Sequence, residues 1–309
     1  MPEVVTVGAA WAVPAALLLG LVAVVAASAD AVMVARRDGV DVRTGAIAPL
    51  AETARLLRQP RRVTPAADAP LWRVGRGGLL VAALLMVAVV PWGSWVPADL
   101  PVGVVWFNAV DVTVWAFVWL AGWGPNAAFS LVGAYRFLAQ ALAYELPLMF
   151  ALTAPALAAG SLRVADVAAA QQGLWFAVWM PVAFAVYCLG VLGFAVWGPL
   201  APPTGGDIAG GVLAEVSGPD RLLLLAGRYA LLAAGAVFAV PLFLGGGAGP
   251  LLPGWLWVLV KALVLVVALV AVGRRLPALR PDRFLELGWM VLLPAVLLQV
   301  LVVALVVVL

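Results

Sequence analysis

Long apolar runs alternate with short polar segments along the whole chain. Each run holds about 20 residues with few charges, the length that an α-helix needs to cross the hydrocarbon core of a membrane. The pattern predicts eight such spans, which lie near residues 5–29, 77–96, 102–123, 129–158, 172–198, 221–245, 252–272 and 285–308. The alternation typical of transmembrane barrel strands is absent. We therefore predict a single all-α membrane domain over residues 1–309, built as a polytopic helical bundle.

The composition agrees with this fold class. Hydrophobic residues make up 66% of the 309 residues and charged residues only 11%, whereas a soluble domain has about 25% charged residues. The chain has no histidine, which excludes a histidine-ligated haem or zinc and a Ser–His catalytic pair. A single cysteine, Cys188, cannot form a disulfide within the chain, and a thiol-based metal site is not expected.

The placement of arginines predicts the orientation. Nine arginines lie in the loop 36–76 and four in the loop 273–284, whereas the opposite side holds only Arg163. By the positive-inside rule these two loops and the loop 199–220 are cytoplasmic, and both termini are outside. The net charge of +3 comes from these membrane-flanking loops, so we expect no nucleic-acid partner.

The first cytoplasmic loop contains a predicted amphipathic helix at about 46–59. Its apolar positions are Ile47, Leu50, Ala51, Ala54, Leu56 and Leu57. Glu52, Arg55 and Arg58 lie between them, and Pro60 ends the helix. Such a helix can lie in the headgroup plane of the lipid bilayer. A solvated linker with some helicity is the alternative.

The fourth span carries an unusual polar face. Arg136, Gln140 and Tyr144 are four residues apart and share one side of a helix, with Glu145 beside them. Charged groups inside hydrocarbon cost several kcal/mol unless they meet a partner, water or a ligand. This stretch therefore indicates a membrane protein whose function uses polar side chains buried within the membrane.

Ionisable side chains also occur in four other spans. They are Asp30, Asp111, Arg228 and Lys261, the only lysine of the chain. Asp30 lies near the cytoplasmic end of its span and can reach the headgroups there. Together with Arg136 and Glu145 these residues mark an ion or proton path, although ion pairs that only fix helix register give the same pattern.

A series of motifs extends over nearly the whole chain. They are PLAE at 49–52, AGW at 121–123, Asn126, Gly133, Arg136, AQ at 139–140, YE at 144–145, EVSG at 215–218, PLFLGG at 241–246, the segment from Trp257 to Lys261, Pro277, Arg280, Asp282, LGW at 287–289 and Pro294. In the order of these motifs and in its number of predicted helices, the chain resembles the membrane subunit of respiratory complex I that borders the quinone site. In bacteria this subunit is known as the H subunit of NADH-quinone oxidoreductase.

This resemblance implies a subunit of a proton-pumping NADH:quinone oxidoreductase in the bacterial inner (plasma) membrane. The chain itself would carry no redox centre and would not be catalytic in isolation. Soluble partner subunits on the cytoplasmic side would hold the iron–sulfur clusters and FMN, and other membrane subunits, including antiporter-like ones, would adjoin it. Quinone, ubiquinone or menaquinone, would be the substrate at the interface.

The resemblance also implies roles for individual residues. The candidates for the quinone chamber are Glu52, Arg55, Asp207, Glu215, Arg280 and Asp282. The candidates for the proton path or for buried charges are Asp111, Arg136, Gln140, Tyr144, Glu145, Arg228 and Lys261. Reduction of a quinone creates negative charge and takes up protons, so nearby buried carboxyl groups would respond to it.

The chain departs from the family pattern at several of these positions. In the acidic loop 202–208 only Asp207 keeps a carboxylate, and Arg228 stands where the family has a glutamate. One hypothesis is that Arg228 neutralises Glu145 or Asp207. These changes keep a second function open, that of a membrane anchor in a complex I-related hydrogenase or formate hydrogenlyase without quinone chemistry. A standalone transporter is a third alternative.

Overall fold

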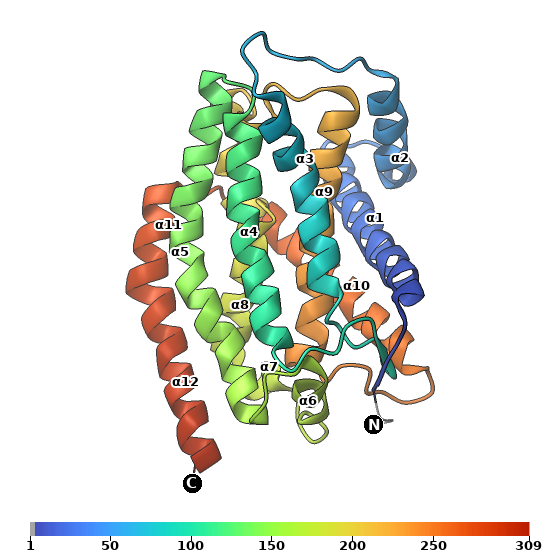
Figure 1. The fold of residues 1–309 in the computed structure, drawn as a ribbon, viewed down its shortest axis with the longest axis vertical. Coiled ribbons are helices and arrows are strands. Elements are labelled where there is room, and N and C mark those ends of the chain that lie inside the picture. Colours follow the sequence, from blue (N-terminus) through green and yellow to red (C-terminus); the bar gives the residue numbers. More distant parts are fainter. Residues whose placement is uncertain (1–3, 309) are drawn as a thin grey trace.

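The computed structural model describes residues 4–308 and shows a bundle of long helices (Figure 1). Within this range seven helices are long and apolar enough to cross a membrane. They are α1 (Ala12–Arg37), α3 (Ala69–Val87), α4 (Gly103–Trp123), α5 (Ala128–Ala159), α9 (Gly218–Phe243), α10 (Gly254–Arg275) and a continuous last helix of α11 (Pro281–Leu287), a π-helical turn (Gly288–Leu292) and α12 (Leu293–Val308). The predicted all-α membrane bundle is confirmed.

The remaining elements are short. They are β1 (Val5–Thr6), the 3₁₀ turn Ala9–Trp11, α2 (Val42–Arg58), β2 (Trp95–Val96), α6 (Val164–Ala169), α7 (Phe176–Trp179), α8 (Pro181–Phe194) and the 3₁₀ turns Gly198–Leu200, Pro202–Thr204, Gly206–Ile208 and Gly211–Leu213. The two strands pair in parallel and attach the first described residues to the connection between α3 and α4.

The spans predicted near 5–29 and 77–96 are displaced along the chain, since α1 ends at Arg37 and α3 ends at Val87. The fifth predicted span, 172–198, differs more. It forms two helices, α7 and α8, separated at Met180, whose φ of −119° and ψ of 51° are not helical. Pro181 starts α8, because proline lacks the N–H that would continue the preceding helix. The 14 residues of α8 extend about 21 Å, less than the hydrocarbon thickness of about 30 Å. A broken helix is tolerated in a membrane where other helices cover its backbone.

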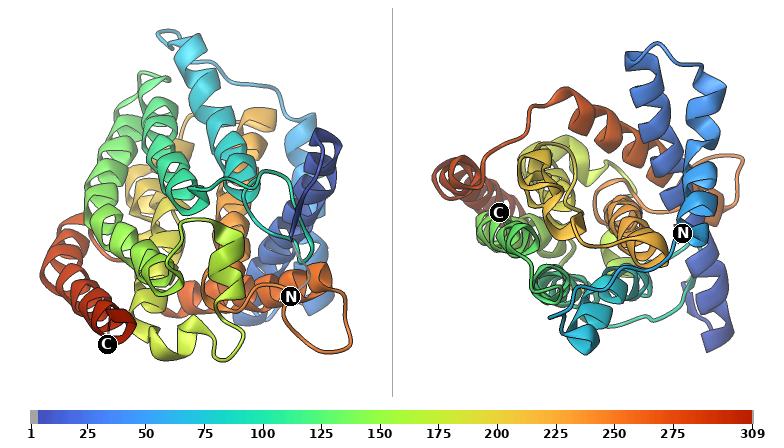
Figure 2. Two further views of the ribbon diagram at one scale, coloured as in Figure 1. Left: turned by 60° about the horizontal axis from the view of Figure 1, so that its bottom comes forward. Right: turned by 90° about the horizontal axis from the view of Figure 1, so that it is seen from above.

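Helix α9 lies at the centre of the bundle. It packs against α1, α3 and α10, and the view along the bundle shows it enclosed by other helices (Figure 2). In the most apolar window of α9 78% of the residues are buried, compared with 17% in the last helix, which lies at the edge. Polar groups on α9 therefore need partners inside the protein.

The amphipathic helix predicted in the first loop is present as α2, and it begins at Val42, earlier than expected. It ends at Arg58 because Gln59, which precedes Pro60, is extended with a ψ of 141°. Leu56 points into the protein, whereas Ile47, Leu50 and Leu57 are exposed. Its position in the lipid headgroups stays a prediction.

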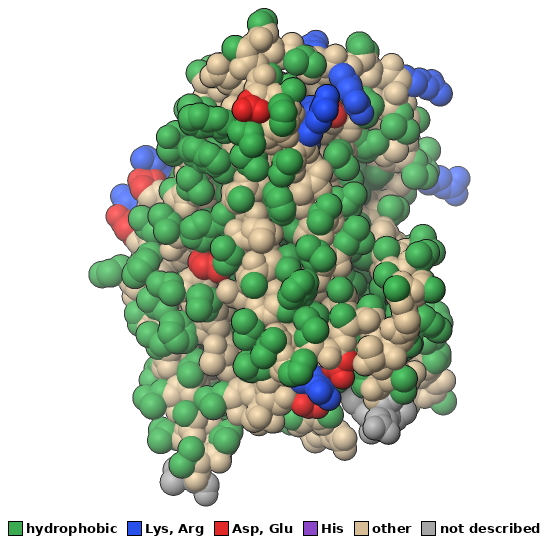
Figure 3. All heavy atoms as spheres, viewed as in Figure 1, with side chains coloured by type: hydrophobic (Ala, Val, Ile, Leu, Met, Phe, Trp, Pro, Cys, Tyr) green, Lys and Arg blue, Asp and Glu red, His purple; other side chains and the backbone are tan. Residues whose placement is uncertain are grey.

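The two ends of the bundle differ in charge. The first and the last described residues both lie at the end of the bundle opposite α2 (Figure 1). On the face that Figure 3 shows, most basic side chains lie toward the α2 end, and a single basic group lies near the other end. We call these the α2 end and the α6 end of the bundle.

Candidate functional site

Two carboxyl groups meet inside the bundle between α4 and α5. Asp111 of α4 is fully buried, Glu145 of α5 is 9% exposed, and their carboxyl groups are neighbours. Asn108 donates from Nδ2 to Oε1 of Glu145 at 3.4 Å. Apart from the neighbouring acid, neither oxygen of Asp111, nor Oε2 of Glu145, has a hydrogen-bond partner in the described part of the chain. We name Asp111 and Glu145 the carboxylate pair.

The carboxylate pair has no basic partner among residues 4–308. Arg136, which lies on the same helix as Glu145, is bound to Asp207. Arg228 donates to the main-chain oxygen of Val196. The hypothesis that Arg228 neutralises Glu145 or Asp207 is therefore wrong. Two acids without a counter-charge and with free oxygens form a site that can accept protons or water.

Two residues of the polar face predicted on α5, Gln140 and Tyr144, contact Gly193 of α8. Gln140 donates from Nε2 to the main-chain oxygen of Gly193 at 2.8 Å, near the end of α8. The ring of Tyr144 lies against the same glycine, where a Cβ atom would come within 2.6 Å of it. The hydroxyl of Tyr144 is buried and has no partner among the described residues. Gln140 thus fixes α8, and Tyr144 extends the buried polar region beside the carboxylate pair.

Four of the predicted residues surround one hollow at the α2 end. The hollow has a volume of about 610 Å³, and its charged lining residues are Arg136, Asp207, Arg280 and Asp282. Arg136 donates to Oδ2 of Asp207 at 2.6 Å and to the main-chain oxygen of Pro202 at 3.3 Å. The hydrogen bond to Asp207 lowers the pKa of its carboxyl below the ordinary value. We call this place the loop hollow.

The EVSG motif is mainly a docking element. Ser217 accepts a hydrogen bond from the N–H of Arg62 at 2.8 Å and donates to the main-chain oxygen of Pro60 at 3.1 Å. Gly218 has a φ of +54°, and a Cβ atom there would lie 2.5 Å from the main-chain oxygen of Gln59. The motif therefore holds the segment after α2 against the start of α9. Glu215 is half-buried and contacts no ion-pair partner among residues 4–308.

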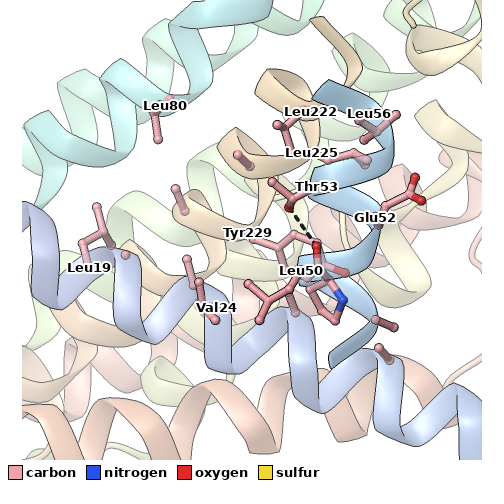
Figure 4. Close-up of a pocket in the computed structure, with 18 of the residues that line it drawn as sticks. Leu19, Val24, Leu50, Glu52, Thr53, Leu56, Leu80, Leu222, Leu225 and Tyr229 are labelled. Carbon is pink, nitrogen blue, oxygen red and sulfur yellow. Dashed lines mark hydrogen bonds between the residues drawn. The ribbon is translucent and has the colours of Figure 1, made fainter. Parts of the chain in front are cut away.

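A groove of about 460 Å³ opens between α1, α2, α3 and α9 (Figure 4). Its lining is apolar apart from Glu52, Thr53 and Tyr229. Leucines from all four helices face it, among them Leu19, Leu50, Leu80 and Leu225. An apolar groove with a few polar groups is the usual form of a site for a largely apolar molecule. We call it the α1–α2 groove.

Glu52 and Arg55 form an ion pair at the edge of the α1–α2 groove. Arg55 donates to Glu52 through Nε at 2.6 Å and through Nη2 at 2.5 Å. This hydrogen bonding lowers the pKa of the Glu52 carboxyl below its ordinary value. Only Glu52 of the predicted quinone-chamber residues lies in this groove, since Asp207, Arg280 and Asp282 line the loop hollow.

Arg228 and Lys261 bind main-chain carbonyl groups, although both were predicted as members of a path. Arg228 is 8% exposed and donates to Val196, a residue with a φ of +53° just after α8. Lys261 lies near the start of α10, and its three donors meet the turn after α9. They bind the oxygens of Leu244 at 2.8 Å, Gly246 at 2.9 Å and Ala248 at 2.9 Å. Both cations therefore fix the chain where helices end.

Sequence reasoning missed one buried and one partly buried ion pair. Arg76 of α3 binds Asp220 at the start of α9 at 2.6 Å. Arg274 of α10 binds Asp30 of α1, which is only 6% exposed, so the expectation that Asp30 reaches the headgroups is wrong. A single acid in a long apolar helix was a signal for Asp30, but its partner lies 244 residues away in sequence.

The site residues thus form three separate places: the carboxylate pair, the loop hollow and the α1–α2 groove. The groove suits an apolar chain, the hollow carries exposed charged side chains, and the pair suits proton exchange. No group of three or more residues among 4–308 could hold a metal ion.

Comparison with known proteins gives one consistent result. The family described as NADH dehydrogenase matches residues 7–304. The chain is 35% identical to an NADH-quinone oxidoreductase H subunit of Geobacter sulfurreducens over 269 residues, which are 84% of this chain and 82% of the relative. It is 36% identical to an H subunit of Cereibacter sphaeroides, covering 82% and 81% of the two chains, and 34% identical to an H subunit of Geobacter metallireducens, covering 84% and 82%.

Proposed function

The chain belongs to the NADH dehydrogenase family, among the H subunits of NADH-quinone oxidoreductase, and from this premise we propose that it forms the membrane side of a quinone site and couples quinone reduction to proton translocation. It acts as one subunit of a proton-translocating enzyme complex. The α1–α2 groove is the observation that carries this proposal, because it gives an apolar substrate an entrance along the membrane.

The groove fits the chemistry of a quinone with an apolar tail. Its volume of about 460 Å³ lies in the range of small-molecule sites, which is about 300–1,000 Å³. It opens beside α2, whose exposed Ile47, Leu50 and Leu57 can face lipid tails. A substrate dissolved in the bilayer therefore enters without crossing water, with its tail among the leucines of α1, α2 and α9.

The loop hollow is proposed as the contact with soluble partner subunits. Arg280 and Asp282 are well exposed, with 81% and 55% of their side-chain surface accessible. The hollow lies at the arginine-rich α2 end, which the positive-inside rule places in the cytoplasm. Electrons would reach the quinone from iron–sulfur clusters and FMN in those partners, and both termini of this chain would lie outside the bacterial cell membrane.

The carboxylate pair is proposed as the first proton-exchanging site in the membrane. A negative charge formed on the substrate changes the free energy of ionisation of acids near it. Asp111 and Glu145 have no counter-ion among residues 4–308, so this change is not offset by a fixed positive partner. The pair would pass the perturbation to further membrane subunits, including antiporter-like ones.

The test is purification of the assembled complex in mild detergent through a tag on this chain. Mass spectrometry of the partners and an inhibitor-sensitive quinone reductase assay are then made on the same sample. Iron–sulfur and antiporter-like partners with quinone reduction support the proposal. A nickel-binding hydrogenase subunit without quinone reduction would overturn it and make the chain a membrane anchor.

A further inference from the structure

Three side chains from three helices meet behind the wall of the α1–α2 groove. Tyr229 of α9 donates its hydroxyl to Oδ2 of Asp30 at 3.1 Å, and Arg274 of α10 donates from Nε to Oδ1 of the same carboxylate. Each oxygen of Asp30 thus has one donor. We call these residues the Asp30 cluster.

Tyr229 belongs both to the cluster and to the groove. Its side chain lines the groove, where it reaches from α9 toward the space between α1 and α2 (Figure 4). Its ring also packs on Trp197, with 5.0 Å between ring centroids. A tyrosine has two side-chain torsions, so a fixed hydroxyl and a packed ring leave it a single position. The position of this part of the groove wall therefore depends on the hydrogen bond that the Tyr229 hydroxyl makes.

Among the charged neighbours of Tyr229, Asp30 is the one that holds its hydroxyl. The guanidinium carbons of Arg228 and Arg274 lie 5.5 Å and 5.9 Å from the centroid of the Trp197 ring, and these groups donate to the main-chain oxygen of Val196 and to Asp30. Asp30 is the hydrogen-bond acceptor of the Tyr229 hydroxyl. The side chain of Arg274 is 45% exposed, so water can solvate it when Asp30 is replaced.

We propose that Asp30 is a positioning residue which, through the hydroxyl of Tyr229, sets the shape of the α1–α2 groove and thereby its hold on the apolar tail of the substrate. This inference rests on the proposed function of the groove. It makes Asp30 a determinant of tail selectivity rather than a member of the proton path. Asp30 acts on the substrate only through Tyr229.

The test compares two quinones with the same head group, one with a long apolar tail and one with a short tail, in the purified complex. Asp30→Ala and Tyr229→Phe should each raise the KM for the long-tailed quinone about tenfold, the effect of one lost charge-assisted hydrogen bond. The kcat and the KM for the short-tailed quinone should stay within about twofold. Asp30→Asn, which keeps an acceptor for Tyr229, should restore most of the long-tail affinity.

Two further variants separate this role from a purely structural one. The double variant Asp30→Ala/Tyr229→Phe should raise the long-tail KM no further than Asp30→Ala alone, because the Tyr229–Asp30 hydrogen bond is already lost in that variant. Asp38→Ala, an exposed acid just after α1, should change neither KM. Equal KM changes for both quinones, or reduced assembly with unchanged KM values, would overturn the inference. If the wild-type complex reduces neither quinone, the proposed function itself has failed.

Discussion

The carboxyl groups of Asp111 on α4 and Glu145 on α5 are neighbours inside the bundle, and apart from each other three of their four oxygens have no hydrogen-bond partner among residues 4–308. Asn108 provides the one donor, to Glu145. Buried acids are normally paired with bases, and such pairing fixes a fold rather than a function. This pair lacks that structural explanation, which is why a role in proton exchange is the stronger hypothesis.

Replacing Glu145 by glutamine tests this role. Glu145→Gln keeps the size of the side chain and an acceptor for Asn108, but it removes the proton-binding group. We expect the complex to assemble and proton translocation to be lost, which a pH-sensitive dye in sealed vesicles can measure during turnover. Glu286→Gln, an exposed acid on α11 paired with Arg283, is the control and should translocate normally. Normal translocation in Glu145→Gln would rule out the relay role.

The ion pair of Asp207 makes a prediction about pH. Because Arg136 lowers the pKa of Asp207 in the folded state, its stabilising effect is complete above the unfolded pKa of about 3.9 and is lost only as the pH falls through the lower folded value. The difference in thermal unfolding midpoint between wild type and Asp207→Asn should therefore be the same at about pH 5.5, 7 and 8.5. A difference that shrinks toward the acidic end would contradict this ion pair.

Lys261 should matter for stability rather than for proton movement. Lys261→Met removes the three hydrogen bonds that the charged ammonium group donates. The three carbonyl groups of the turn after α9 then lose this donor. We expect a loss of about 3 kcal/mol or more in the free energy of unfolding. Thermal unfolding of the purified complex measures this change.

The control for Lys261 is Arg163, a cation near the same end of the bundle. Its ion pair with Asp99 is 3.5 Å long and 42% of its side-chain surface is exposed. Arg163→Met should therefore cost less than about 1 kcal/mol. If Lys261→Met is as mild as this control, or if it abolishes proton translocation in a stable complex, the structural role is wrong.

Gly218 should not tolerate a side chain. Its φ of +54° disfavours other residues, and a Cβ atom would lie 2.5 Å from the main-chain oxygen of Gln59. Gly218→Ala should cost about 1–3 kcal/mol and release the segment after α2, which limited proteolysis between residues 59 and 68 detects. Gly206→Ala, where nothing lies within 4 Å of the added atom, should leave both the stability and the cleavage pattern unchanged.

The presence and order of the long helices followed from the sequence because the length of an apolar run is a direct consequence of membrane thickness. The break in the fifth span was missed for the same reason. Hydropathy averages over about 19 residues, and Pro181 stands among apolar neighbours that keep this average high. The backbone at Met180 is a local property that such an average does not contain.

The candidate residues were found as residue types, but their partners were not. Arg228 was visible as a charge in an apolar helix, yet its acceptor is the carbonyl group of Val196, and a main-chain group leaves no mark in the sequence. Asp30 and Tyr229 are 199 residues apart, and their contact depends on how α1 and α9 pack. Residue types predict that a buried polar group exists, whereas tertiary packing decides what it binds.

The central position of α9 has a consequence for biosynthesis. Helices of a membrane protein are made in order, and a polar side chain that enters lipid without a partner is costly. Three polar side chains of α9 each bind a group that comes earlier in the chain. These partners are Arg76 for Asp220, the Val196 carbonyl for Arg228 and Asp30 for Tyr229. When α9 is synthesised, the groups that its polar side chains bind have therefore already been made. Only the ion pair between Asp30 and Arg274 forms later, because Arg274 belongs to α10.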